Sequence, residues 1–116
     1  MSRLNRRRRG PVAAAISPLQ VAARRRAYEP TCRLTQRELA ALAGVSRNLV
    51  AKYERAQTLV PSVEAVVRLG LALRVEALLD PRTREALSHD VESRRPVIEA
   101  RARRRIARTR RRRARQ

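Results

Sequence analysis

The 116-residue sequence contains very few aromatic residues: two tyrosines, no phenylalanine and no tryptophan. Hydrophobic residues still make up 43% of the chain, so a core must be built from Leu, Val, Ile and Ala. Strands are enriched in aromatic and β-branched side chains, whereas this set suits closely packed helices. We therefore expect an all-α fold, and the length leaves room for one compact domain with tails.

Residues that perform catalysis or bind metals are equally scarce. Cys32 is the only cysteine and His89 the only histidine, so the sequence offers neither a disulfide framework nor a zinc cluster. The three glycines are isolated and form no phosphate-binding loop: Gly10, Gly44 and Gly70. We expect no enzyme activity, no cofactor and no metal, and a reducing, intracellular setting.

Long hydrophobic runs are also missing, and none approaches the ~18–20 residues that a membrane span needs. The basic N-terminus and the apolar stretch after it have a superficial likeness to a secretory signal, but Pro11 and Pro18 bracket a stretch too short for one. A transit peptide would be richer in serine than residues 1–28 are. We expect a cytoplasmic, nucleoid-associated protein with no membrane partner.

Positive charge, in contrast, is abundant: 29 basic residues against 10 acidic ones give a net charge of +19, and Lys52 is the only lysine. Guanidinium groups match phosphates and guanine edges, although a GC-rich genome would favour arginine over lysine equally well. Residues 1–33 carry nine Arg and one Glu (+8), residues 34–87 eight basic and six acidic residues (+2), and residues 88–116 twelve Arg and three acidic residues (+9). This distribution predicts a nearly neutral folded domain between basic arms that bind polyanions or are disordered.

Breakers and helix caps divide the chain into four parts. We expect a flexible basic arm at 1–16, a folded domain at 17–80, an extra helix or dimerisation segment at 81–95, and an Arg-rich tail at 96–116. The tail has almost no apolar stripe and many like charges three and four residues apart. We expect it to be disordered alone and helical against phosphates.

The domain begins with a helix that Ser17 caps and that runs to about Tyr28, where Pro30 stops it. Its inner side is expected to carry three apolar residues: Leu19, Ala22 and Ala23. Its outer side carries Arg24 and Arg25.

A helix-turn-helix is predicted between Leu34 and Arg55. Thr35 and Glu38 form a capping box that opens a helix ending at Ala43, and Gly44 supplies the left-handed residue of a sharp turn. Ser46 caps the next helix, which runs to about Arg55 with three residues on its inner face: Leu49, Val50 and Tyr53.

Further helices complete the expected bundle. Ser62 caps a fourth helix, residues 74–80 form a short fifth one, and residues 81–92 form another. The first helix, the two helices of the helix-turn-helix and the fourth and fifth helices make the expected compact bundle of about five short helices with basic arms, and the helix at 81–92 is additional.

The sequence LTQRELAALAGVS at residues 34–46 resembles the start of the helix-turn-helix of phage repressors and Cro proteins, the XRE family. Residues 50–55, 61–64 and 71–79 continue the pattern, so the resemblance covers roughly residues 34–80. It implies a DNA-binding domain whose recognition helix, 47–55, enters the major groove. Ala56 and Arg74 stand where the family usually has glycine.

The resemblance assigns base contacts to Arg47, Asn48 and Lys52. Their chemistry agrees, since Arg pairs with guanine and Asn with adenine, although on their own these residues would be an ordinary solvated helix face. It also implies that Gln36 contacts a phosphate and braces the recognition helix. Further phosphate contacts are expected at Arg37, Ser46 and Arg55.

Glu54 is expected to be structural, paired with an arginine or a backbone amide. The arms are expected to contact nucleic acid without sequence preference through these arginines: Arg6, Arg7, Arg8, Arg9, Arg103, Arg104, Arg105, Arg110, Arg111, Arg112 and Arg113.

Three hypotheses for function follow. The first is a transcriptional regulator, a repressor, that binds double-stranded operator DNA as a homodimer through its fifth helix and residues 81–92. The second is an antitoxin-like protein that neutralises a protein partner and regulates its own operon. The third is non-specific RNA binding or nucleoid packaging, dominated by the tails.

Overall fold

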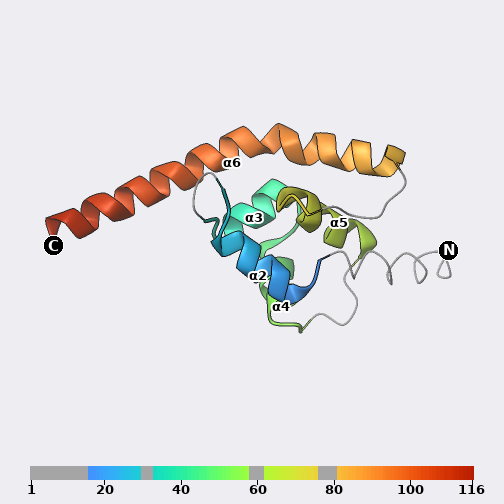
Figure 1. Ribbon diagram of the computed structural model, residues 1–116, viewed down its shortest axis with the longest axis horizontal. Coiled ribbons are helices and arrows are strands. Elements are labelled where there is room, and N and C mark those ends of the chain that lie inside the picture. The colour runs from blue at the N-terminus through green and yellow to red at the C-terminus, as the bar shows by residue number, and fades with distance from the viewer. Residues whose placement is uncertain (1–15, 30–32, 58–61, 76–80) are drawn as a thin grey trace.

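The computed structural model describes residues 16–29, 33–57, 62–75 and 81–116, which hold helices and no strand (Figure 1). The helices are α2 (Pro18–Arg26), α3 (Gln36–Ala43), α4 (Arg47–Glu54), α5 (Val63–Ala72) and α6 (Pro81–Arg115). The all-α fold expected from the composition is confirmed. The arginines at positions 6–9, Cys32 and residues 76–80 of the expected fifth helix lie outside the described residues.

Hydroxyl side chains start four of these helices, each by accepting a hydrogen bond from the backbone N–H three residues later. These hydroxyls belong to Ser17, Thr35, Ser46 and Ser62. At Ser17 and Thr35 the backbone N–H of the cap residue donates in return to the side chain of the third helical residue, which completes a capping box. The predicted starts of these helices are confirmed.

Gly44 forms the turn between α3 and α4 with φ +78°, as the sequence predicts. Its N–H donates to the Ala40 carbonyl, while the Arg68 guanidinium donates to the carbonyl of Ala43. A Cβ added at Gly44 would lie 2.8 Å from an Arg94 nitrogen and 2.9 Å from an Arg68 nitrogen. The turn therefore needs a residue that accepts positive φ and has no side chain.

We predict that Gly44→Ala lowers the free energy of unfolding by about 1–2 kcal/mol, because a left-handed conformation costs an L-residue that much. The two arginine ends are flexible and can shift, so the cost comes mainly from the backbone. Urea unfolding measures it. Gly70→Ala is the comparison, since Gly70 lies inside α5 and an added Cβ there meets only the Val75 carbonyl, at 3.5 Å. Equal losses in both variants would contradict the prediction.

The positions at which the family pattern usually has glycine also adopt left-handed conformations. Ala56 has φ 57° and Arg74 has φ 59°. Arg74 is thus a turn residue that follows α5, and the helix expected to begin there does not do so. The backbone keeps the two turns although the glycines are replaced.

We expect Ala56→Gly to stabilise the protein by about 0.5–1 kcal/mol, since it relieves the left-handed strain and loses part of that gain to the more flexible unfolded chain. Ala56 is exposed, so the change removes no packing. The midpoint of urea unfolding should rise. Ala51→Gly, inside α4, should lower it instead, and a fall in both variants would refute the strain at Ala56.

The core lies where α3, α4 and α5 meet and is covered by α6 (Figure 1). Leu39 and Leu42 of α3, Val50 of α4 and Leu69 of α5 are fully buried. Ile16 is also fully buried, and its carbonyl accepts a hydrogen bond of 2.7 Å from the Tyr53 hydroxyl. The end of the expected N-terminal arm is therefore part of the core.

The helix α2 packs against the rest of the domain through a different face from the one predicted. Leu19 is 79% exposed, whereas Val21 is fully buried. Val21 and Arg25 are four residues apart and share a face, and an ion pair of Arg25 with α4 turns this face inward. The prediction was wrong because it placed arginine outside.

α6 is much longer than the expected helix at 81–92 and passes through Pro96 without ending. Proline has no N–H to donate and bends a helix, and α6 bends in its orange part, the stretch that contains Pro96 (Figure 1). The bend lets one helix contact both α5 and α3.

The expected disordered tail is therefore a helix in this structure. Five of the described residues of α6 are buried. Four of them are spaced four, three and four apart, Val91, Arg95, Ile98 and Ala102, and the fifth is Glu99. The expected division between residues 95 and 96 falls inside the helix. Leu87 and Val91, on the segment expected to form a dimer, pack against the chain's own core.

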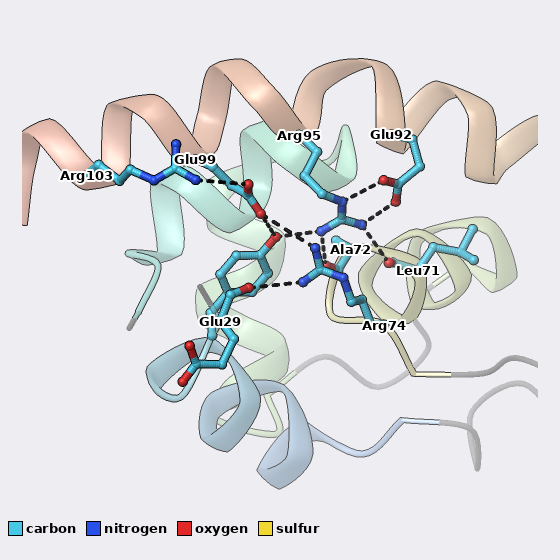
Figure 2. A network of polar contacts seen from close by, with 9 residues as sticks. Glu29, Leu71, Ala72, Arg74, Glu92, Arg95, Glu99 and Arg103 are labelled. Carbon is cyan, nitrogen blue, oxygen red and sulfur yellow. Dashed lines mark hydrogen bonds and ion pairs between the residues drawn. The ribbon is translucent and has the colours of Figure 1, made fainter. Parts of the chain in front are cut away.

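A polar network fastens α6 to the end of α5 (Figure 2). Arg95, only 6% exposed, donates to the carbonyls of Leu71 and Ala72, to the Tyr28 hydroxyl and to Glu92. The Tyr28 hydroxyl donates in turn to Glu99 at 2.7 Å. Burial and the Glu99 bond raise the pKa of Tyr28. The buried guanidinium thus donates to two carbonyls at the end of α5, where the regular hydrogen bonds of the α-helix stop.

Candidate nucleic-acid interface

The recognition helix α4 presents a polar outer face and an apolar inner one. Val50 and Tyr53 are buried, and Leu49 packs partly against the core. The three residues expected to read bases, Arg47, Asn48 and Lys52, are all exposed. Asn48 and Lys52 are four residues apart, so they lie on one face with Arg47 beside them at the start of the helix.

Glu54, at the end of α4, holds this helix to α2 and α3. Arg25 donates two hydrogen bonds to its carboxylate, at 2.7 and 2.9 Å, and the Gln36 amide donates a third at 3.1 Å. The Glu54 side chain is 6% exposed and that of Arg25 is 13% exposed. The structural role predicted for Glu54 is confirmed, and Gln36 braces the recognition helix through it.

The expected phosphate contacts differ in their surroundings. Gln36 is half-buried, while Arg37, Ser46 and Arg55 are exposed. The Ser46 hydroxyl already accepts the Leu49 N–H as the cap of α4. Gln36, Arg37 and Arg47 meet at an open concavity of about 630 Å³ between α2, α3, α4 and α6, whereas Arg55 lies at the other end of α4.

Two arginines of α6, Arg101 and Arg105, line the same concavity, which we name the arginine basin. Arg105 donates to Glu38 at 2.8 and 2.9 Å, so this member of the expected arm is an anchor of the fold. Among the described residues, Arg37, Arg47 and Arg101 contact no carboxylate, so three helices direct unpaired guanidinium groups to one place.

The structural role of Arg25 and the position of Arg101 in the basin were not predicted from the sequence. The ion pair of Arg25 with Glu54 spans 29 residues and has no local signal. Nothing in the sequence distinguishes Arg101 from the other arginines of this segment, and its position in the basin depends on the contact between α6 and α3. Arg103, also in the expected arm, lies 3.7 Å from Glu99, while Arg110–Arg113 are exposed.

Glu38 and Glu54 keep their charge at lower pH than a free carboxyl group would. Burial opposes ionisation of both, but hydrogen bonds from Arg105 and Thr35 outweigh it and lower the pKa of Glu38. Bonds from Arg25 and Gln36 do the same for the pKa of Glu54.

The lowered pKa values of Glu38 and Glu54 predict how the stability of the fold depends on pH. Because both folded-state pKa values lie below the ordinary 4.5, the unfolded chain takes up protons first as the solution is acidified. The melting temperature should change little from pH 7 to about 5 and fall as the pH drops below about 4.5. Glu54→Gln should start lower and fall less steeply, as followed by circular dichroism. A wild-type melting temperature that stays constant down to pH 3 would contradict this account.

The part of the chain described here contains no group of three His, Cys, Asp or Glu residues that could hold a metal ion. In the same residues, no helix is both long and apolar enough to cross a membrane.

The capped helix, the left-handed glycine turn and the braced second helix with a polar outer face define a helix-turn-helix. Comparison with known families agrees, because the Helix-turn-helix family model matches residues 27–78. Residues 27–78 are therefore a helix-turn-helix domain of the XRE type, and a domain of this class supports a DNA-binding regulator. No curated protein and no solved structure matched the chain.

Proposed function

We propose that the protein is a sequence-specific repressor that binds operator DNA as a homodimer. The observation that carries the proposal is the outer face of α4, where Arg47, Asn48 and Lys52 are exposed together on a helix held by Glu54. Side chains near the start of such a helix reach base edges in the major groove. Guanine for Arg47 and adenine for Asn48 are the expected partners.

Homodimerisation is proposed because one helix of eight residues contacts only a few base pairs. Two copies would double the site and give it two-fold symmetry, with half-sites about one helical turn, ~34 Å, apart. Leu87 and Val91 of the segment 81–92 contribute to the chain's own core, so they are not assigned to the dimer interface.

Selection of bound sequences from a random duplex pool tests the proposal. The full chain should be compared with a chain that ends at Thr109, which keeps the buried Ala102 and the Arg105 anchor. Both forms should recover the same palindromic consensus, the shorter one with weaker binding to all sequences. Recovery of no consensus by either form would refute sequence-specific binding, and a consensus without two-fold symmetry would refute the homodimer.

Repression is tested separately, with a reporter gene whose promoter carries the recovered site. Expression should fall when the protein is present and recover with Arg47→Ala. An increase in expression would overturn repression and leave DNA recognition intact.

A further inference from the structure

The arginines of the C-terminal half of α6 are arranged by face, because the helix is anchored to the domain up to Ala102. Residues 101–116 contain ten arginines and no acidic residue. Six of them recur three or four residues apart, the spacing of one helix face, and are all exposed. We name this set the arginine stripe: Arg101, Arg104, Arg108, Arg111, Arg112 and Arg115.

The stripe begins in the arginine basin. Arg101 lines the basin together with Arg37 of α3 and Arg47 of α4. Arg101 directly precedes the buried Ala102, so the stripe is turned about 100° from the buried face of α6. On the edge of the buried face that adjoins the stripe, Arg105 reaches Glu38 at the start of α3. On the opposite edge of the buried face, Arg103 lies near Glu99, which accepts a hydrogen bond from the Tyr28 hydroxyl. The stripe thus continues the side of the domain on which the recognition helix begins.

The charges of the stripe have no partners within the described chain. None of its six arginines contacts a carboxylate, and like charges three and four residues apart destabilise a helix. A polyanion would remove this repulsion, and a phosphate backbone presents its charges at regular intervals.

We propose that the arginine stripe binds the phosphate backbone of the same DNA duplex that α4 reads, beyond the bases that α4 contacts. This inference rests on the proposed function and adds that α6 holds its arginines to one side, so that Arg101 and Arg108 face the DNA and Arg103 and Arg110 do not. From Arg101 to Arg115 the helix rises about 21 Å, the length of about six base pairs. DNA is favoured over RNA because the stripe adjoins a helix that needs a wide major groove, which A-form RNA lacks.

The test compares two double variants of the full chain: Arg101→Gln with Arg108→Gln, and Arg103→Gln with Arg110→Gln. Each removes two exposed charges seven residues apart from the same helix, so a flexible arm would lose the same affinity from both. The probe is the duplex recovered by random selection, flanked by ten base pairs of arbitrary sequence on each side. Binding is measured from 50 to 200 mM salt, and circular dichroism confirms that both variants are folded.

The variant with Arg101→Gln and Arg108→Gln is named the stripe variant. Its slope of log affinity against log salt should be smaller than that of the wild type by about 1.8, or 0.9 for each lost phosphate contact. Its loss of affinity between 50 and 200 mM salt should then be about tenfold smaller than that of the wild type. Hydroxyl-radical footprints should lose protection in the flanks and keep it over the consensus. The Arg103 and Arg110 variant should match the wild type in slope and footprint.

Equal changes in both variants, or no change in either, would overturn the proposal. In both cases the proposed function would stand if the consensus is still selected. Tight binding of a single-stranded or hairpin RNA that the stripe variant alone loses, with the DNA slope unchanged, would assign the stripe to RNA and overturn it as well.

Discussion

Replacement of Arg95 by alanine should lower the free energy of unfolding by about 3–5 kcal/mol, the usual cost of breaking a buried charged network. The change leaves the carbonyls of Leu71 and Ala72 and the hydroxyl oxygen of Tyr28 with fewer donors in a buried place. For a domain of this size the melting temperature should fall by at least about 12 °C. Thermal unfolding followed by circular dichroism at pH 7 measures the loss.

Arg94→Ala is the matched control for this prediction, since it removes the same side chain one residue earlier in α6. Arg94 is 39% exposed and pairs with Asp90 one turn away on the same helix. Such an exposed pair contributes little to stability. If both variants melt at the same temperature, the Arg95 network does not hold α6 in place.

Arg47→Ala should abolish the preference for one base pair of the consensus. Arg47 is exposed at the first position of α4 and has no partner among the described residues, so its removal should leave stability within about 0.5 kcal/mol. A bidentate contact to guanine contributes about 1–3 kcal/mol of discrimination. Binding to the consensus should weaken by about five- to 150-fold, while binding to a site mutated at that position should weaken only slightly, through the loss of one positive charge.

The comparison variant is Arg84→Ala, in the exposed first turn of α6, which also removes one positive charge. It should weaken consensus and mutated sites slightly and equally, because it changes only long-range attraction. If Arg47→Ala also weakens all sites equally, Arg47 is a phosphate contact, and base reading falls to Asn48 and Lys52.

The helix-turn-helix could be predicted from the sequence because its determinants are local. Thr35, Ser46 and Ser62 each lie three residues before the backbone N–H that they bind, and Gly44 satisfies a single dihedral angle. The exposed face of α4 then follows from helical periodicity. Such signals are readable within four or five residues.

The role of α6 could not be predicted in this way. Its buried face has helical spacing, but Arg95 occupies one of the four positions and Pro96 follows it, so the pattern indicates a break. The groups that make the buried arginine favourable lie far away, with Tyr28 67 residues and Ala72 23 residues distant in sequence. The arginine basin depends on the same packing of α6, since its four helices contribute residues that are not neighbours in the chain.

The burial of Ala102 has a consequence for the shortest stretch of chain that can fold. This residue is fully buried although it lies beyond residue 78, where the match to the helix-turn-helix family model ends. A fragment cut at the end of that match would lack α6 and would expose the faces of α3 and α5 that α6 covers. Fragments truncated before Ala102 should not compete with the full protein for DNA.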